Sequence, residues 1–319
     1  MCLLGTPLPT STAGADLRRY EYSADAMGGS FYIALYSAAR SDADAAAEAA
    51  FGELRRLDSM LSNYRPDSEW STTNRDAAER PVRVSQELFD LISECLEFSR
   101  LSEGAFDVTV GPLMRAWGFF GGHSKLPDEE GIKQALDHVG YRHIVLDSTS
   151  RTVEFARAQL EMDPGGIGKG YAVDRMVGEL KRRHVDRALV SAAGSTIYAL
   201  GVPPGREGWP VNIGLSGKPD FAAGKLMLKD ESLSSSGNSE KFLRIGGRIY
   251  GHILDPRTGY PVRGVLLVAV RAPRAIDSEA WTKAFFVNGR SWAARHLPAG
   301  FRVFLCEEES ELPQCTWMP

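Results

Sequence analysis

The sequence predicts an α+β fold in which helices pack on mixed or antiparallel β-sheets. Segments with apolar residues three and four positions apart, typical of amphipathic helices, are interspersed with shorter strand-like segments. The two kinds of segment do not follow the strict alternation that builds a parallel sheet. The 319 residues are 43% hydrophobic and 24% charged, as in an ordinary globular protein with a substantial core.

Each predicted helix has one apolar face. The first begins at Ser41-Asp-Ala-Asp44, which has the pattern of a capping box, and the second ends at Gly104. The apolar stripe of the first helix consists of Ala47, Ala50, Phe51, Leu54, Leu57 and Leu61. The expected helices are 41–61, 85–102, 129–138, 172–180 and 275–288.

Short apolar or alternating runs predict the strands. The first two strands flank a turn at Met27-Gly28-Gly29, and a strand at Tyr250 leads into a tight turn. The serine-rich segment 232–238 is predicted to be a solvated loop, although its hydroxyls could contact a ligand. A polar, frayed tail is expected after the last strand. The expected strands are 18–22, 30–36, 143–146, 152–155, 188–190, 196–199 and 302–305, with further strands around positions 211 and 227.

Composition narrows the classes of partner. The net charge of −4 and the absence of a basic run give no electrostatic case for nucleic acid or an anionic membrane. Cys2, Cys95, Cys306 and Cys315 are widely spaced and imply neither a zinc site nor a disulfide framework. We expect Cys95 and Cys306 to be small apolar fillers of the core.

The start of the chain bears on localisation. Residues 1–7 lack the basic start and the apolar length of a signal peptide. No segment approaches the ~20 apolar residues that span a bilayer. We expect a cytoplasmic protein, or an exported or lipid-anchored one whose leader has been removed, with Cys2 as a remnant of lipidation.

One stretch is unusually rich in glycine, Asp163-Pro-Gly-Gly-Ile-Gly-Lys-Gly-Tyr-Ala-Val-Asp174. Glycines let the backbone approach a ligand closely, and amides at a helix start favour anionic oxygens. Lys169 adds a positive charge there, which is typical of a loop that holds a phosphate. The stretch matches neither a Walker A motif nor the spacing of the dinucleotide fingerprint. The alternative is a glycine-rich turn that simply enters a helix.

Two further polar residues lie in unusual surroundings. Asp107 lies among apolar residues and glycines in the sequence. A buried carboxylate there needs backbone amides or a ligand as hydrogen-bond partners. The alternative is a turn aspartate that caps a short helix. His252 and Asp255 lie three residues apart at a strand end, close enough to share a ligand. His252 could act as a base or as a donor to phosphate, or it could have a structural role.

Five separated stretches together resemble the ApbE family of flavin transferases. They cover most of the chain in the family's order. The stretches are Met27-Gly28-Gly29, Leu61-Ser-Asn-Tyr64 with Asp67-Ser68, Gly104-Ala-Phe-Asp-Val-Thr-Val-Gly-Pro-Leu113 with Trp117-Gly118, Asp163 to Asp174, and His252-Ile-Leu-Asp-Pro-Arg-Thr-Gly-Tyr-Pro261. Residues 1–16, rich in Pro, Ser, Thr and Gly, are expected to be a flexible tail. The resemblance implies a single ApbE-like catalytic region over 17–319, or one built as two intertwined α+β lobes.

Members of this family move FMN from FAD onto a threonine or serine hydroxyl of an acceptor protein. The resemblance implies FAD as substrate and an acceptor flavoprotein as partner. The implied FAD contacts are Met27, Tyr64, Ala105, Phe106, Asp107, Asp163, Lys169, Ser236 and His252. The hydroxyl would attack the FMN phosphorus and expel AMP, and the candidate catalytic residues are His252, Asp255 and Lys169.

A magnesium ion takes part in the family, and here the sequence departs from the pattern. The resemblance implies the carbonyl of Gly166 as one ligand. The family's aspartate and threonine ligands, one helical turn apart, align with Glu279 and Lys283. A charged lysine cannot ligate magnesium. We hypothesise that the ammonium of Lys283 occupies the metal position, held by Glu279; the alternative is an exposed salt bridge of little energy.

Other alignments and departures leave further possibilities open. A rival register uses Asp277 and Thr282, which needs a one-residue bulge in the helix. The segment 191–195 stands where the family has an Asn-x-Gly-Gly-Asp type sequence, and Gly237-Asn238 stands where it has glycine and aspartate. Besides flavin transfer, the sequence is compatible with hydrolysis of FAD to FMN and AMP, or with FAD binding without catalysis.

Overall fold

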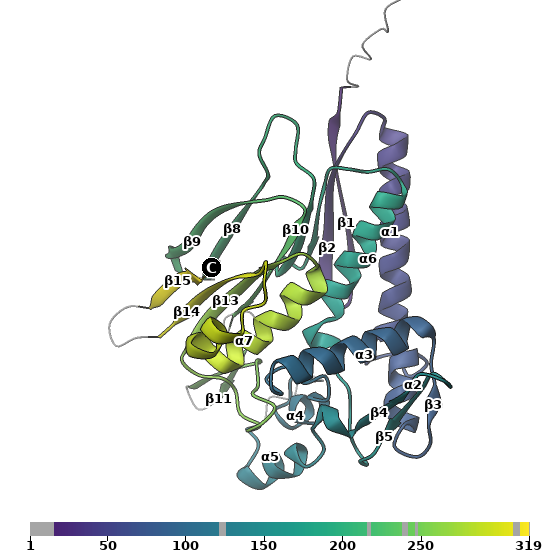
Figure 1. Cartoon of the computed structure of the whole chain (residues 1–319), viewed down its shortest axis with the longest axis vertical. Helices are drawn as coiled ribbons and strands as arrows, with labels where there is room; N and C mark the ends of the chain where they lie inside the picture. The colour runs from purple at the N-terminus through teal and green to yellow at the C-terminus, as the bar shows by residue number, and fades with distance from the viewer. Residues whose placement is uncertain are drawn as a thin grey trace, which may run out of the picture.

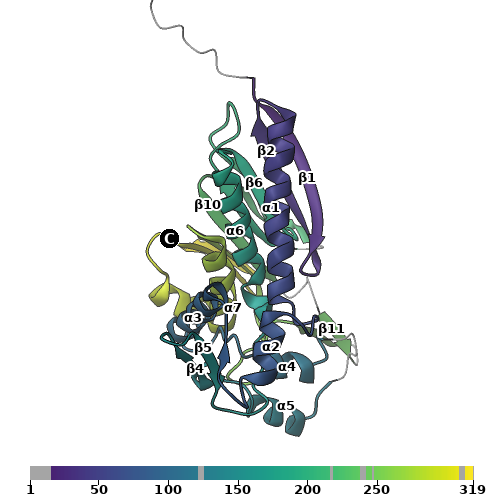
Figure 2. The same cartoon turned by 90° about the vertical axis from the view of Figure 1, so that its right-hand side faces the viewer.

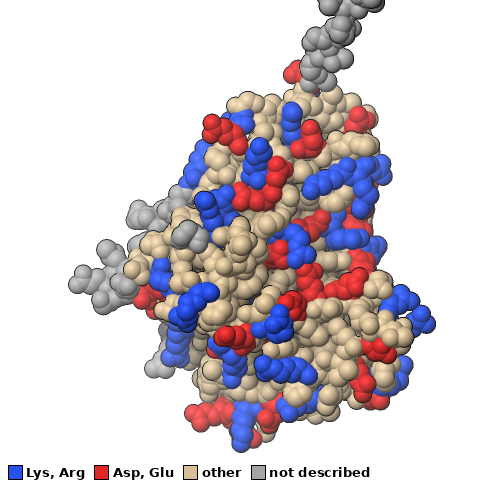
Figure 3. All heavy atoms as spheres, viewed as in Figure 1, with Lys and Arg blue, Asp and Glu red and all other residues tan. Residues whose placement is uncertain are grey.

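The computed structural model describes residues 16–120, 126–215, 218–237, 242–245, 248–308 and 313–318. Apart from Asp16, the predicted tail lies outside these residues, as does Asn238. Within the described ranges, none of the helices has the length and apolar character needed to span a bilayer. Acidic and basic side chains are interspersed over the face shown in Figure 3.

An eight-stranded sheet forms the centre of the fold (Figure 1). Each strand pairs antiparallel with its neighbours, so the predicted α+β class is confirmed. In spatial order the strands are β1 (Arg18–Ala26), β2 (Gly29–Ser37), β6 (Ala188–Ala192), β7 (Thr196–Leu200), β10 (Glu231–Gly237), β13 (Val265–Ala272), β14 (Arg302–Glu307) and β15 (Gln314–Met318).

Three long helices cover one face of this sheet (Figure 2). They are α1 (Arg40–Leu61), α6 (Gly168–Arg182) and α7 (Ala275–His296). The predicted stripe of α1 is buried throughout, and all of it except Leu61 packs in one core with Phe31, Ile33 and Leu35 of β2. Ala34 points to the opposite face, as the alternation of a strand requires, and meets Trp209. That second face is covered by the hairpin of β8 (Trp209–Leu215) and β9 (Lys218–Leu228).

A smaller group of elements lies between α1 and α6 in the sequence and below the large sheet in Figure 1. Its three-stranded sheet packs with α3 in a core that also includes α7. The elements are α2 (Glu69–Asp76), β3 (Val82–Arg83), α3 (Gln86–Leu101), α4 (Gly111–Ala116), α5 (Glu129–Leu136), η1 (Tyr141–His143), β4 (Ile144–Asp147), β5 (Thr152–Phe155) and η2 (Pro164–Gly166). A hairpin of β11 (Phe242–Ile245) and β12 (Arg248–Gly251) completes the fold.

The segment predicted as a solvated loop is instead the buried strand β10. Its polar sequence is compatible with burial because α7 and β13 supply hydrogen-bond partners. Ser234 Oγ lies 2.8 Å from Ser278 Oγ, and Ser236 Oγ donates to Thr282 Oγ1 over 2.9 Å. Ser232 Oγ donates to the carbonyl of Ala272 over 2.8 Å. Buried hydroxyls that are satisfied in this way carry little energetic penalty.

Three other predictions were wrong. The helix α1 begins at Arg40, after Ala39, so Ser41 lies within its first turn and makes no capping bond. The supposedly frayed end of the chain forms β15, which pairs with β14. Cys306 is buried as predicted but forms a disulfide with Cys315 on β15, whereas Cys95 is a free, buried thiol.

Candidate active site

A pocket of about 440 Å³ lies where the five sequence stretches meet. It is lined by the β1–β2 turn, the end of α1, the segment before α4, the glycine-rich stretch, α7, residues 252–254 and Pro256. Of the predicted site residues, those that line it are Met27, Tyr64, Ala105, Phe106, Asp107, Asp163, Gly166, Lys169, His252 and Lys283. Stretches that are far apart in the sequence therefore form one site.

Hydrogen bonds between these stretches fix the shape of the site. The amide of Met27 donates to Asp58 Oδ1 on α1 over 2.8 Å. Trp117 is buried and donates from Nε1 to the carbonyl of Gly259 over 2.8 Å, which ties α4 to the turn after His252. Gly259 has a φ of 79°, and a Cβ atom there would lie 2.7 Å from Ile132, so this turn requires glycine.

The glycine-rich stretch forms one side of the pocket and leads into α6. Asp163 caps η2 by accepting a hydrogen bond from the amide of Gly165 over 3.0 Å, and a second one from Asn63 Nδ2 over 3.2 Å. Gly166 lies against Phe106, because a Cβ atom at position 166 would be 2.9 Å from Cε2 of that ring. The stretch is thus both a turn that enters a helix and a pocket wall, which favours the phosphate interpretation.

A carboxylate and two lysines meet beside this wall. Lys169 Nζ lies 3.1 Å from Glu279 Oε1, and Lys283 Nζ lies 3.7 Å from the same oxygen. Glu279 Oε2 accepts a hydrogen bond of 2.5 Å from the amide of Gly170. The side chain of Glu279 is 1% exposed, so its pair with Lys283 is not the exposed salt bridge that was the alternative.

The charges of the two lysines determine the ionisation of Glu279. Burial alone would raise the pKa of this carboxyl group. The ammonium groups of Lys169 and Lys283, together with the amide of Gly170, outweigh burial and hold the pKa of Glu279 below its ordinary value. Glu279 is therefore a carboxylate at neutral pH, with both oxygens engaged by groups of α6 and α7.

These residues do not fit a magnesium ion. Magnesium takes oxygen ligands, but position 283 carries an ammonium and the Glu279 oxygen nearest to it faces a second ammonium. Within the part of the chain that the structure describes, no group of three or more His, Cys, Asp or Glu side chains has the spacing of a metal site.

The rival helix register does not supply the missing ligands. The side chain of Asp277 is ion-paired with Arg274, and Thr282 Oγ1 donates to the carbonyl of Glu279 over 2.7 Å. The backbone of α7 is helical from Ala275 to Asn288 and departs from helical geometry at Gly289, so the bulge that this register needs is not present. The segment 191–195 comprises the end of β6 and the β6–β7 turn, where Ser195 Oγ donates to the carbonyl of Ala192.

Aromatic side chains also line the pocket. Tyr64 is 77% exposed and contacts Phe120 edge to face, with ring centroids 6.3 Å apart. Phe106 is buried against Phe98, whereas Phe119 and Phe120 also line the pocket. Phe120 and Asn63 were not predicted as site residues. For Phe120, the sequence signal was the aromatic pair at 119–120 directly before two glycines.

Asp107 is held by the protein itself. Its Oδ1 accepts hydrogen bonds from the amide and the hydroxyl of Thr109, over 2.8 and 2.7 Å, and its Oδ2 accepts one from the amide of Tyr141 over 2.9 Å. Burial raises the pKa of Asp107 despite these bonds. The partners are mainly backbone amides, so Asp107 shapes the segment that carries Ala105 and Phe106.

The remaining candidates are not brought together. His252 lines the pocket, but Asp255 does not, because its carboxylate pairs with Arg257 at 2.9 Å within the turn. Ser236 lies on the buried face of β10 against Thr282 and does not line the pocket. The predicted roles of Asp255 and Ser236 in catalysis and FAD binding stay predictions.

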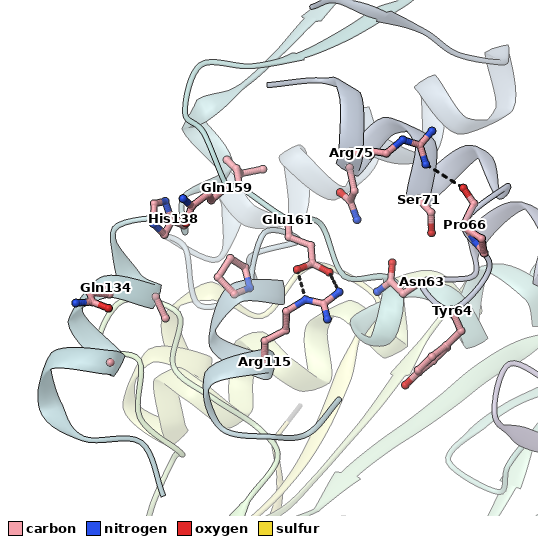
Figure 4. Close-up of a pocket in the computed structure, with 15 residues that line it drawn as sticks. Asn63, Tyr64, Pro66, Ser71, Arg75, Arg115, Gln134, His138, Gln159 and Glu161 are labelled. Atoms are coloured by element: carbon pink, nitrogen blue, oxygen red, sulfur yellow. Dashed lines mark hydrogen bonds and ion pairs between the residues drawn. The ribbon is translucent and has the colours of Figure 1, made fainter. Parts of the chain in front are cut away.

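A second, more open hollow of about 840 Å³ adjoins the pocket and shares Asn63 and Tyr64 with it (Figure 4). In Figure 4, Arg115 and Glu161 face one another among the residues that line it, and their bidentate ion pair has distances of 2.5 and 2.6 Å. The site therefore consists of an inner pocket with charged and aromatic sides and an outer hollow beside Tyr64.

A pocket of this kind, on an antiparallel α+β scaffold, is a ligand site whose lysines suit phosphate groups and whose aromatic side chains suit ring systems. Comparison with known proteins agrees. The chain belongs to the ApbE family, whose model matches residues 27–302. The family resemblance of the sequence is thereby confirmed.

Individual relatives cover most of the chain. A protein of Klebsiella pneumoniae (strain 342) named FAD:protein FMN transferase is 32% identical over 282 residues, which are 86% of this chain and 84% of that protein. A protein of the same name from Treponema pallidum (strain Nichols) is 32% identical over 294 residues, 86% of this chain and 80% of the relative.

Solved structures show the same fold. The crystal structure of the ApbE protein from Thermotoga maritima MSB8 matches with a TM-score of 0.84 at 31% identity, and covers 94% of this chain and 97% of that one. The apo form of the Pseudomonas stutzeri flavinyl transferase ApbE matches with a TM-score of 0.83 at 26% identity, and covers 94% of this chain and 95% of that one.

Proposed function

We propose that this protein is an FAD:protein FMN transferase, which moves FMN from FAD to a threonine or serine hydroxyl of an acceptor protein and releases AMP. The observation that carries the proposal is the pocket in which the glycine-rich stretch, Lys169 and His252 lie together, in a chain of the ApbE family. Two relatives with 32% identity are named for this reaction.

The geometry suits binding of FAD with its diphosphate towards the lysines. Lys169 and Lys283 both line the pocket beside Gly166, where they would neutralise phosphate oxygens. The exposed ring of Tyr64 and the neighbouring Phe119 and Phe120 offer faces for the flavin or the adenine. The open side next to Tyr64 leaves room for a segment of the acceptor protein.

The chemical step replaces the phosphoanhydride bond of FAD by a phosphate ester to the acceptor hydroxyl. The acceptor oxygen forms a bond to the FMN phosphorus, and the bond from that phosphorus to the oxygen of AMP breaks. The proton of the hydroxyl passes to a base, for which we propose His252, whose side chain lines the pocket. The lysines stabilise the charge that develops on the phosphate oxygens.

The test is a labelling reaction with purified protein, FAD and a threonine-bearing acceptor peptide. We expect flavin fluorescence on the denatured peptide together with an equal amount of AMP. A peptide in which valine replaces the threonine is the matched control and should stay unlabelled. Formation of AMP and free FMN without labelling would identify a hydrolase instead, and FAD retained without either product would contradict the proposed catalysis.

A further inference from the structure

The two lysines at the pocket are held by one carboxylate that the pocket itself does not expose. Lys169 Nζ and Lys283 Nζ lie 3.1 and 3.7 Å from the same oxygen of Glu279. Their side chains are 27% and 21% exposed, whereas that of Glu279 is 1% exposed. Both lysines line the pocket and Glu279 does not. A bound ligand therefore meets the ammonium groups.

The positions of these charges are fixed from both helices. Lys169 belongs to the first turn of α6, and Lys283 lies one helical turn after Glu279 on α7. The second oxygen of Glu279 accepts a hydrogen bond of 2.5 Å from the amide of Gly170, which keeps the carboxylate between the helices. The cluster of three side chains carries one net positive charge, directed at the pocket.

A divalent cation and this cluster compete for the same place. An ion at Glu279 Oε1 would lie beside two ammonium groups, which repel it and already neutralise the carboxylate. The ammonium of Lys283 supplies positive charge at that place without a metal, because a lysine is a compact point charge that binds phosphate.

We propose that Lys169 and Lys283, held by Glu279, bind the diphosphate of FAD directly and take the place of a divalent cation. The inference rests on the proposed function in one respect, namely that FAD is the ligand of this pocket. It extends that function by making FAD binding independent of magnesium in this chain.

The first experiment measures FAD binding by flavin fluorescence in metal-free buffer with EDTA, and again with magnesium chloride. The affinity of the unaltered protein should be the same in both. Addition of Mn²⁺ to the FAD complex, followed by electron paramagnetic resonance, should give no signal of a protein-bound ion. Magnesium-dependent FAD binding, or one tightly bound Mn²⁺ per chain, would overturn the inference without any variant being needed.

The second experiment tests the lysine itself. Replacement Lys283→Met should lower the affinity for FAD about tenfold or more, which is the effect of losing one hydrogen bond to a charged group. Lys133→Met is the matched control, because Lys133 is exposed on α5 and does not line the pocket. The affinity of this variant for FAD should not change. Equal affinity of the Lys283→Met variant and the unaltered protein would overturn the inference.

A third variant restores the residue types of a metal site. The double replacement Glu279→Asp with Lys283→Thr removes the ammonium and leaves oxygen ligands one helical turn apart. We expect this variant to bind Mn²⁺ and to require magnesium for FAD binding. Failure to acquire a metal ion would show that Lys283 does not stand in a cation position.

The outcomes separate this inference from the proposed function. If FAD binds only with magnesium, the inference that the lysines take the place of a cation is contradicted, whereas the proposed transferase function is not. If FAD binds without metal but is never transferred to a peptide, the transferase function is contradicted, whereas the inference about the lysines is not. A protein that does not bind FAD under any condition contradicts both.

Discussion

The backbone of α6 at Gly170 lies directly against that of α7 at Ala275, so that a Cβ atom at position 170 would be 2.4 Å from the Ala275 carbonyl oxygen. Real Cβ atoms do not approach a carbonyl oxygen this closely. This contact brings the helix that carries Lys169 next to the helix that carries Glu279. The absence of a side chain at Gly170 is therefore a condition for the charged cluster at the pocket.

Replacement Gly170→Ala should destabilise the protein. The added methyl group must separate two backbones, and overpacking of this kind costs about 1–3 kcal/mol or more. Gly178→Ala, further along the same helix, is the matched control: the nearest atom to its Cβ is Arg182 Nη1 at 3.8 Å, and alanine favours a helix by up to ~1 kcal/mol. Urea denaturation should show opposite shifts, and equal shifts would contradict the close contact.

Asp174 lies at the same contact between α6 and α7, and it makes the free energy of unfolding depend on pH. Its two oxygens accept hydrogen bonds from the amides of Ala275 and Ile276, over 2.7 and 2.9 Å, and so cap the start of α7. Burial raises the pKa of Asp174 from 3.8 to about 6, against the effect of these amides. The folded protein then binds a proton more tightly than the unfolded chain.

The sign of the effect follows from this difference. Between about pH 4 and pH 6 the folded state holds a proton at Asp174 that the unfolded state has released, so stability falls as pH rises through this range. A shift of about two pKa units corresponds to ~3 kcal/mol. Urea denaturation across this range should show a slope that Asp174→Asn reduces. An unchanged slope in the variant would contradict the raised pKa.

His252 offers a test of catalysis apart from binding. If it accepts the proton of the acceptor hydroxyl, His252→Asn should slow FMN transfer by about 10²–10⁴-fold and leave FAD affinity within a fewfold of the original. His184→Asn is the control, because His184 is exposed beyond the end of α6 and has a positive φ that asparagine tolerates. A comparable loss of FAD affinity and of transfer would assign His252 to binding.

The sequence predicted the local parts of the site better than the contacts between them. The spacing of Glu279 and Lys283 by four residues predicted their pairing on one helical face, and the structure has it. The second lysine at Glu279 comes from α6, more than a hundred residues away, so no periodicity could predict it. For the same reason β10 was predicted as a loop, because the partners of its hydroxyls lie on α7 and β13.

The last hairpin leads to a proposal about localisation. Cys306 of β14 and Cys315 of β15 are direct partners in the strand register and form a disulfide. Disulfides persist mainly in oxidising compartments. We propose that this protein functions in such a compartment, which agrees with the expectation of an exported protein rather than a cytoplasmic one.

The disulfide should be measurable in the protein and in the cell. Alkylation of the denatured, unreduced protein should leave Cys306 and Cys315 unlabelled, whereas Cys95 should become labelled because its thiol is free. In the folded protein, burial raises the pKa of the Cys95 thiol. Double replacement of Cys306 and Cys315 by serine should lower the free energy of unfolding by about 2–3 kcal/mol, because the closed loop is short and its entropy gain on opening is modest. Cys95→Ala serves as the control for loss of a cysteine without loss of a disulfide. Alkylation of both cysteines in protein trapped directly from cells would place the chain in a reducing compartment and contradict the proposal.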